Sequence, residues 1–125
     1  MNLLLDTHVL LWALADDPEL AGDAREAIID PSNLVIVSAV SAWEIVIKAN
    51  LGKLRAPDDL PMQLRRAAFE PLPVTIEHAM AVGELPAHHA DPFDRLLVAQ
   101  SRTEELTLVT RDARILDYDV ASLHA

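Results

Sequence analysis

The segment NLLLDTHVLLW (residues 2–12) decides the fold class predicted for this chain, because it places an acidic residue between two apolar runs. The consecutive leucines Leu3 to Leu5 are typical of a short strand buried on both faces, as in a parallel sheet. The residues from about His8 to Ala15 are apolar on most sides and predict a helix. Asp6 therefore lies at the carboxyl end of a strand, where parallel α/β sheets form their sites.

The same alternation of strands and helices continues along the chain. Short apolar runs predict further strands over residues 34–37, 72–74, 106–109 and 119–122. Pro71 and Pro73 flank the second of these runs, which indicates an edge strand. Helices are expected over residues 18–30, 39–50, 59–69, 75–84, 91–105 and 112–117. This order predicts an α/β fold in which residues 1–125 form one domain, with a central, mostly parallel sheet and helices on both faces.

Composition excludes several classes of protein. The 125 residues include no cysteine, which excludes disulfide scaffolds, cysteine-based zinc sites and thiol catalysis. No apolar run approaches the roughly 18 residues needed to span a bilayer. The N-terminal stretch lacks a basic region and contains Asp6, so we do not expect a signal peptide. These features predict a soluble, cytoplasmic protein.

The net charge of −10 argues at first against phosphate binding, but the charge is unevenly distributed. Five of the ten basic side chains lie within residues 48–66, which have a net charge of +3. Residues 1–47 have a net charge of −7, and residues 67–125 have −6. The basic stretch is either an ordinary solvated helical face or a surface that guides an anionic substrate.

Four carboxylates are predicted to meet at the carboxyl edge of the sheet. Asp6 and Asp112 each follow a predicted strand, Glu44 lies in the helix after the second strand, and Asp94 lies in the first turn of another helix. Each also has a purely structural interpretation. The three aspartates fit positions at helix N-termini, with Asp91 as the cap before Asp94.

Glu44 has its own structural interpretation as part of a polar helix face. It is spaced for an i,i+4 ion pair with Lys48, and Ser38 and Ser41 precede it at three-residue intervals.

If the four carboxylates do converge, their mutual repulsion favours proton uptake unless a cation compensates for it. Mg²⁺ or Mn²⁺ fits an all-oxygen site to which Thr7, Ser38 and Thr110 add hydroxyls. Zinc is disfavoured because the chain has neither cysteine nor a spaced histidine pair, and we expect His88 and His89 to lie in a surface loop. A metal-filled acidic pocket suits phosphodiester hydrolysis by an activated water, with one carboxylate orienting that water.

Four motifs together resemble a known family. They are DTHVLLW (residues 6–12), SAWEI (41–45), DPFDRLLVAQ (91–100) and VTRD (109–112). In this order they resemble PIN-domain ribonucleases and, more narrowly, VapC-type toxins of type II toxin–antitoxin systems. The resemblance implies a three-layer α/β/α fold and a Mg²⁺- or Mn²⁺-dependent endoribonuclease that cleaves RNA. It also implies a homodimer and a VapB-type antitoxin that occupies the acidic groove.

Carried over position by position, the resemblance assigns the catalytic and metal-binding roles to Asp6, Glu44, Asp94 and Asp112. Asp91 is kept as a helix cap and a reserve ligand. Ala90 stands where close relatives commonly have arginine, which puts an RNA contact at that position in doubt.

Neighbours of these motifs have two interpretations each. Leu11, Trp12 and Leu14 are either core residues or part of a groove for an antitoxin. Arg95 and Arg111 either bind RNA phosphate or neutralise the adjacent acids.

Two alternative functions remain. The first is a catalytically silent PIN-like module that only binds a protein partner. The second is a phosphoacceptor receiver domain, which needs a lysine after a late strand, whereas the only lysines here are Lys48 and Lys53. The RNA target is not readable from the sequence, because loops and shape decide RNA recognition.

Overall fold

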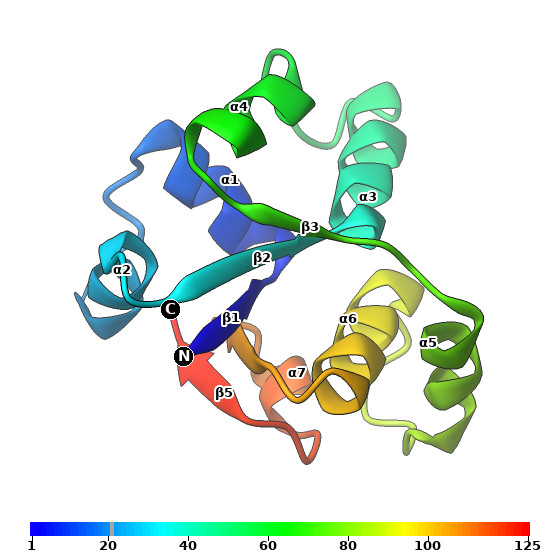
Figure 1. Ribbon diagram of the computed structural model, residues 1–125. Coiled ribbons are helices and arrows are strands. Elements are labelled where there is room, and N and C mark those ends of the chain that lie inside the picture. The colour runs from blue at the N-terminus through cyan, green and yellow to red at the C-terminus, as the bar shows by residue number, and fades with distance from the viewer. Residues whose placement is uncertain (21) are drawn as a thin grey trace.

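Parallel strands form the centre of the computed structural model, which describes residues 1–20 and 22–125 (Figure 1). Within these residues the strands are β1 (Asn2–Leu5), β2 (Leu34–Ser38), β3 (Glu70–Leu72), β4 (Thr107–Thr110) and β5 (Ser122–His124). They form one sheet in the order β3-β2-β1-β4-β5, and every neighbouring pair is parallel. The predicted α/β class with a parallel sheet is confirmed.

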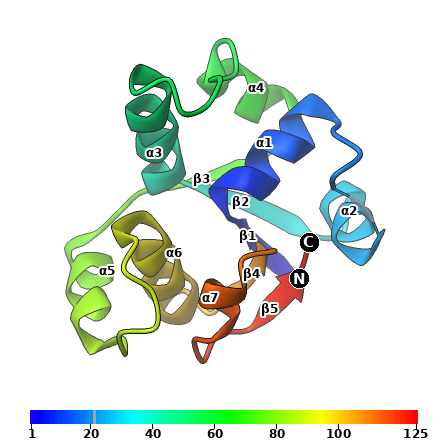
Figure 2. The ribbon, with the colours of Figure 1, turned by 180° about the vertical axis from the view of Figure 1, so that it is seen from behind.

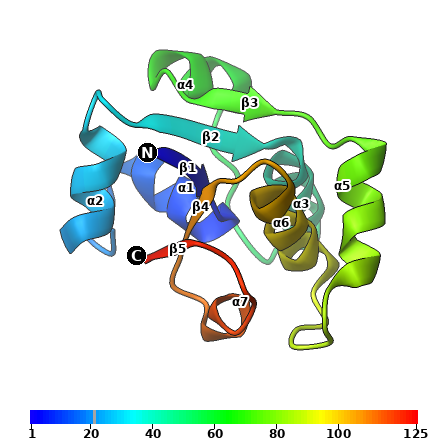
Figure 3. The ribbon, with the colours of Figure 1, turned by 60° about the horizontal axis from the view of Figure 1, so that its bottom comes forward.

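Helices cover both faces of this sheet (Figures 1 and 3). They are α1 (Thr7–Ala15), α2 (Gly22–Ile29), α3 (Ala39–Asn50), α4 (Leu60–Arg66), α5 (Ile76–Ala81), α6 (Pro92–Thr103) and α7 (Ala113–Leu116), with a 3₁₀ turn η1 (Val82–Glu84) after α5. Helices α1, α2 and α4 pack on one face, and α5, α6 and α7 on the other, whereas α3 contributes to both cores. No helix of the described residues combines the length and apolarity needed to cross a membrane.

The alternation of side chains along each strand explains the two cores. Leu3 and Leu5 point into the core beneath α1, while Leu4 between them points into the core beneath α6. In β2, Ile36 likewise faces the α6 side, whereas its neighbour Val37 faces the other. Burial on both faces accounts for the unbroken apolar runs in the sequence.

Some element boundaries differ from those predicted. Strand β3 begins at Glu70 and includes Pro71, which an edge strand tolerates because only one side of it is paired. Helix α2 begins at Gly22 rather than near residue 18, because Asp17 accepts hydrogen bonds from the following backbone and forms a turn. Ala21, inside the predicted 18–30 helix, lies outside the described residues. Strand β5 forms two to three residues later than predicted, at Ser122–His124.

Candidate active site

The carboxyl ends of β1 and β4 open into an acidic cavity. Helices α1, α3, α6 and α7 surround these strand ends (Figure 2). The cavity has a volume of about 480 Å³. It is lined by Asp6, Thr7, His8, Trp12, Glu44, Lys48, Asp91, Asp94, Arg111, Asp112 and Arg114. The structure therefore places all four sequence-predicted acids, and Asp91, around one space.

Asp6 is both a helix cap and a site residue. Its Oδ1 accepts a hydrogen bond of 2.8 Å from the backbone N–H of Val9, and its Oδ2 accepts one from the Thr110 hydroxyl. Burial raises the pKa of the Asp6 carboxyl, and the charge of Asp112 adds to this effect, while the bonds from Thr110 and Val9 oppose it. The structural and functional interpretations are thus compatible, since capping orients the carboxylate.

Asp112 and Asp91 follow the same pattern at the starts of α7 and α6. Oδ1 of Asp112 accepts from the backbone of Arg114 at 2.9 Å, and Oδ1 of Asp91 accepts from the backbones of Phe93 and Asp94 at 2.8 and 3.2 Å. In each carboxylate one oxygen is fixed by a helix N-terminus, so the side chain is oriented before any ligand binds.

The Glu44 carboxylate is buried, and each of its oxygens has a partner within the chain. Its Oε1 accepts a 2.6 Å hydrogen bond from the hydroxyl of Thr7, and its Oε2 pairs with the ammonium of Lys48. This contact raises the pKa of Lys48. The predicted i,i+4 ion pair is therefore present inside the cavity. Ser38, predicted as a site hydroxyl, instead caps α3 by accepting from Val40 at 3.0 Å, and it does not line this cavity.

Asp94 is a second carboxyl in the cavity whose pKa is raised. Burial raises its pKa to about 6, the negative charge of Asp91 contributes in the same direction, and a hydrogen bond with His89 opposes the shift. Its Oδ2 lies 2.7 Å from Nε2 of His89. This carboxylate has only a modest preference for its charged form near neutral pH.

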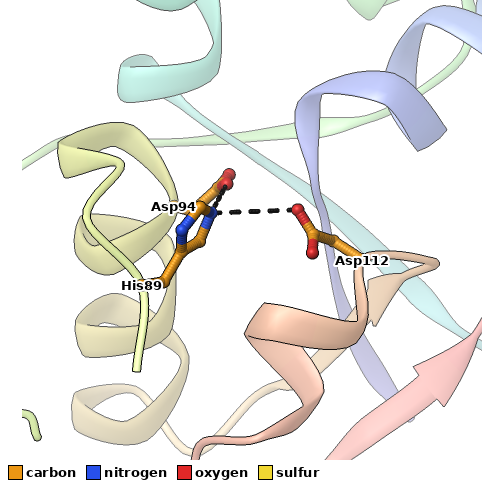
Figure 4. Close-up of side chains that lie close together, drawn as sticks. All are labelled: His89, Asp94 and Asp112. Atoms are coloured by element: carbon orange, nitrogen blue, oxygen red, sulfur yellow. Dashed lines mark hydrogen bonds and ion pairs between the residues drawn. The ribbon is translucent and has the colours of Figure 1, made fainter. Parts of the chain in front are cut away.

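His88 and His89 lie in a loop as predicted, and His88 is exposed, but the prediction that His89 lies at the surface is wrong. Its side chain is only 5% exposed, and its Nε2 lies near Asp94 and, at 3.8 Å, near Oδ2 of Asp112 (Figure 4). One ligand atom from each of these three residues lies within 4.8 Å of the others. The backbone N–H of His89 donates to the hydroxyl of Tyr118 at 3.1 Å. The sequence offers one weak signal, namely that His89 lies two residues before the Asp91 cap, close to the start of α6.

Neither Arg95 nor Arg111 pairs with the acids of the cavity. The guanidinium of Arg95 donates to the backbone oxygen of Pro86 at 2.9 Å and to the hydroxyl of Tyr118 at 3.1 Å, so it braces the loop that holds His89. Arg111 lies 4.4 Å above the ring of Trp12 and lines the cavity. The Arg111 guanidinium pairs with the Glu19 carboxylate at 2.6 Å and donates to the backbone oxygen of Ala125 at 2.8 Å, so its charge is balanced outside the acidic set.

A second hollow adjoins the cavity across Trp12. It has a volume of about 440 Å³, and Leu11, Trp12, Leu14 and Arg55 are among its lining residues. The three apolar side chains also pack against the core beneath α1. They therefore serve both as core residues and as the wall of a groove.

The family model of the PIN domain matches residues 3–121. The chain belongs to the PIN-domain family. This PIN-domain chain is 41% identical over 70 residues to Ribonuclease VapC16 of Mycobacterium tuberculosis, in an alignment that covers 50% of the chain and 48% of that relative. It is also 28% identical over 125 residues to Ribonuclease VapC22 of the same organism. This alignment covers 91% of the chain and 89% of that relative.

Solved structures show the same PIN fold. VapBC2 from Rickettsia felis, bound to a promoter DNA fragment, matches with a TM-score of 0.72 at 16% identity, covering 99% of this chain and 98% of that chain. DNA-bound VapBC from Salmonella typhimurium matches with a TM-score of 0.68 at 17% identity and the same coverage. The predicted family and its three-layer fold are confirmed.

The donor set of this PIN-domain site fits a divalent cation. Among the described residues, Asp6, Asp91 and Asp94 form no ion pair with a lysine or an arginine. Burial and neighbouring carboxylates raise the pKa values of Asp6 and Asp94, so a nearby positive charge would favour their ionised forms. A hard divalent cation, which prefers oxygen ligands, supplies that positive charge.

Proposed function

We propose that this chain is a metal-dependent endoribonuclease that acts as the toxin of a toxin–antitoxin pair. The observation that carries the proposal is the convergence of Asp6, Glu44, Asp94 and Asp112 around one open cavity at the carboxyl edge of the sheet. Membership of the PIN family and similarity to two chains named as VapC ribonucleases support the same function.

Asp6, Asp94 and Asp112 are the residues proposed to hold Mg²⁺ or Mn²⁺, with Asp91 in reserve. When bound, such an ion lowers the pKa of a coordinated water and offsets charge on the phosphate. Thr110 and the N-terminus of α1 hold the Asp6 carboxylate in a fixed orientation. The chain therefore contributes a preorganised set of acceptors that can orient the attacking water and take up its proton.

Glu44 has a different part in this proposal. Both of its oxygens are already engaged by Thr7 and Lys48, so it fixes the Lys48 ammonium at the cavity wall. An ammonium there is suited to attract the phosphate of an RNA strand. The other basic side chains of residues 48–66 are spread more widely, with Arg55 on the second hollow and Arg65, in the last turn of α4, on a separate hollow beside β3. Their part in guiding RNA stays a prediction.

A VapB-type antitoxin is the partner we propose, together with a homodimer of the toxin. The similar solved structures are VapBC pairs, which makes the same kind of pairing reasonable for this chain. The net charge of −10 favours a basic antitoxin segment by long-range attraction. The second hollow, with Leu11, Trp12 and Leu14 on its wall, suits the apolar side chains of such a segment.

The test is RNA cleavage by the purified chain with Mg²⁺ or Mn²⁺, before and after addition of EDTA. We expect Asp6→Asn and Asp94→Asn to lower the rate by about 10²-fold or more, because each removes charge that stabilises the bound ion. Asp23→Asn is the matched control, since Asp23 is exposed on α2 and lies outside the cavity. Cleavage that persists in EDTA, or full activity in both site variants, contradicts the proposal and favours a silent binding module.

A further inference from the structure

We propose that His89 is a direct ligand of the bound metal, adding one nitrogen to the carboxylate set and favouring a first-row transition ion such as Mn²⁺ over Mg²⁺. This inference rests on the proposed function, because it concerns the ion of the same site. It goes beyond an all-oxygen site, because it assigns an imidazole to the metal.

The Nε2 atom of His89 lies close enough to carboxylate oxygens of Asp94 and Asp112 for the three residues to share one ion. Its Nε2 lies 2.7 Å from Oδ2 of Asp94 and 3.8 Å from Oδ2 of Asp112. Atoms bound about 2.1 Å from one ion lie about 3 Å apart when adjacent and about 4.2 Å apart when opposite. The two distances fall in or near that range. Figure 4 shows the imidazole edge turned toward both carboxylates, which come from separate elements.

The loop that presents His89 is held in place. Arg95 donates to the backbone oxygen of His89 at 3.4 Å and to the Tyr118 hydroxyl at 3.1 Å. That hydroxyl in turn accepts from the His89 backbone N–H at 3.1 Å. The backbone of His89 is thus held by contacts from two other segments, and its imidazole is buried with Nε2 directed at Asp94 and Asp112.

Adjacent and nearby histidines provide a natural contrast. His88 is exposed and packs its ring edge-on against Tyr118, with ring centroids 5.1 Å apart. His8 lines the cavity but is exposed, and its ring lies 6.1 Å from that of Trp12. Of these three, only His89 is buried and directs a nitrogen at two acids of the cavity.

The chemistry of the donors predicts metal preference. Mg²⁺ takes oxygen ligands almost exclusively, whereas transition ions accept imidazole nitrogen readily. A site with one imidazole and two carboxylates therefore gains more from a transition ion than from Mg²⁺. The alternative is that His89 only orients Asp94 by hydrogen bonding and never contacts the ion.

Pulsed electron paramagnetic resonance of the untagged Mn²⁺-loaded protein separates these two roles. We expect modulation from a directly coordinated nitrogen, which changes on ¹⁵N-histidine labelling and is lost in His89→Gln. The modulation persists in the controls His88→Gln and His8→Gln. Bound Mn²⁺ without coordinated nitrogen in the wild type, or nitrogen modulation retained in His89→Gln, overturns the inference and leaves the proposed function intact. Absence of any Mn²⁺ binding contradicts both.

Calorimetry provides a second readout that does not require RNA cleavage. We expect His89→Gln and His89→Asn to weaken Mn²⁺ binding by about 10-fold or more and Mg²⁺ binding by much less. Circular dichroism without metal checks that each variant is folded, and two replacements keep the test valid if one is not. Equal losses for the two ions, or no loss for either, contradict direct coordination by His89.

Discussion

The two sides of the acidic cavity are stabilised differently. On one side, Glu44 is buried against Lys48 and Thr7, so its charge is balanced by the chain itself. On the other, Asp94 is paired with His89 and, within the described residues, with no lysine or arginine, and its pKa is raised to about 6. The Glu44 side is complete without a ligand, whereas a proton or an external cation would stabilise the Asp94 side.

The largest change in the free energy of unfolding is expected for a substitution on the Glu44 side of the cavity. Lys48→Met leaves a buried carboxylate unpaired, which we expect to lower the free energy of unfolding by about 3 kcal/mol at pH 7. Urea unfolding measures this loss. The double variant Glu44→Gln/Lys48→Met recovers part of it, and Lys53→Met is the control because Lys53 is exposed and outside the cavity. A change below about 0.5 kcal/mol for Lys48→Met shows that the pair is not important for stability.

An opposite effect is expected on the Asp94 side in metal-free protein. The folded-state pKa of about 6 is above the ordinary value of 3.8 for an aspartate, so the folded state binds more protons and loses stability as the pH rises from about 4 to 7. Asp94→Asn removes this loss, and we expect it to stabilise the protein by about 1–2 kcal/mol at pH 7.5 but little at pH 4. Urea unfolding in EDTA at both values measures the difference. If Asp94→Asn instead destabilises the protein at pH 7.5, the negative charge of Asp94 is already compensated in the folded chain.

The smallest change in stability is expected at Asp6, which also lines the cavity. The hydroxyl of Thr110 donates to Asp6 and accepts from the backbone N–H of Asp112 at 3.1 Å. Thr110→Val keeps the shape of the side chain and removes both bonds, which we expect to cost about 1 kcal/mol in unfolding free energy. Thr107→Val, on the same strand but only partly buried, is the control. Equal effects for the two variants refute a specific role for the Thr110 hydroxyl.

The features that the sequence predicts correctly are those encoded by residues close together in the chain. The leucine run before Asp6 and the Asp91-Pro92 pair specify a strand end and a helix start through short-range chemistry, and both form as predicted. The same pattern indicated that the carboxylates at these ends share one edge of the sheet. The sequence leaves open whether each acid is a helix cap or a site residue. Asp6 shows that one side chain can be both, because it caps a helix and also lines the cavity.

Long-range contacts explain what was missed. The burial of His89 depends on Tyr118, which lies 29 residues away and belongs to the segment after α7. Arg95 was expected to meet RNA or neutralise the acids, but loop carbonyl oxygens and Tyr118 take up its guanidinium. Such contacts follow from the packing of α6 against the C-terminal segment, which no local motif records. The catalytic roles of the four acids stay predictions.

The central claim, that the Asp94 side of the cavity binds an external cation, is tested most directly by calorimetric titration with Mn²⁺ at pH 7.5. The account predicts that wild type and Asp23→Asn bind Mn²⁺ alike, while Asp94→Asn binds at least about 10-fold more weakly. Mn²⁺ binding of equal affinity in Asp94→Asn and the wild type contradicts it.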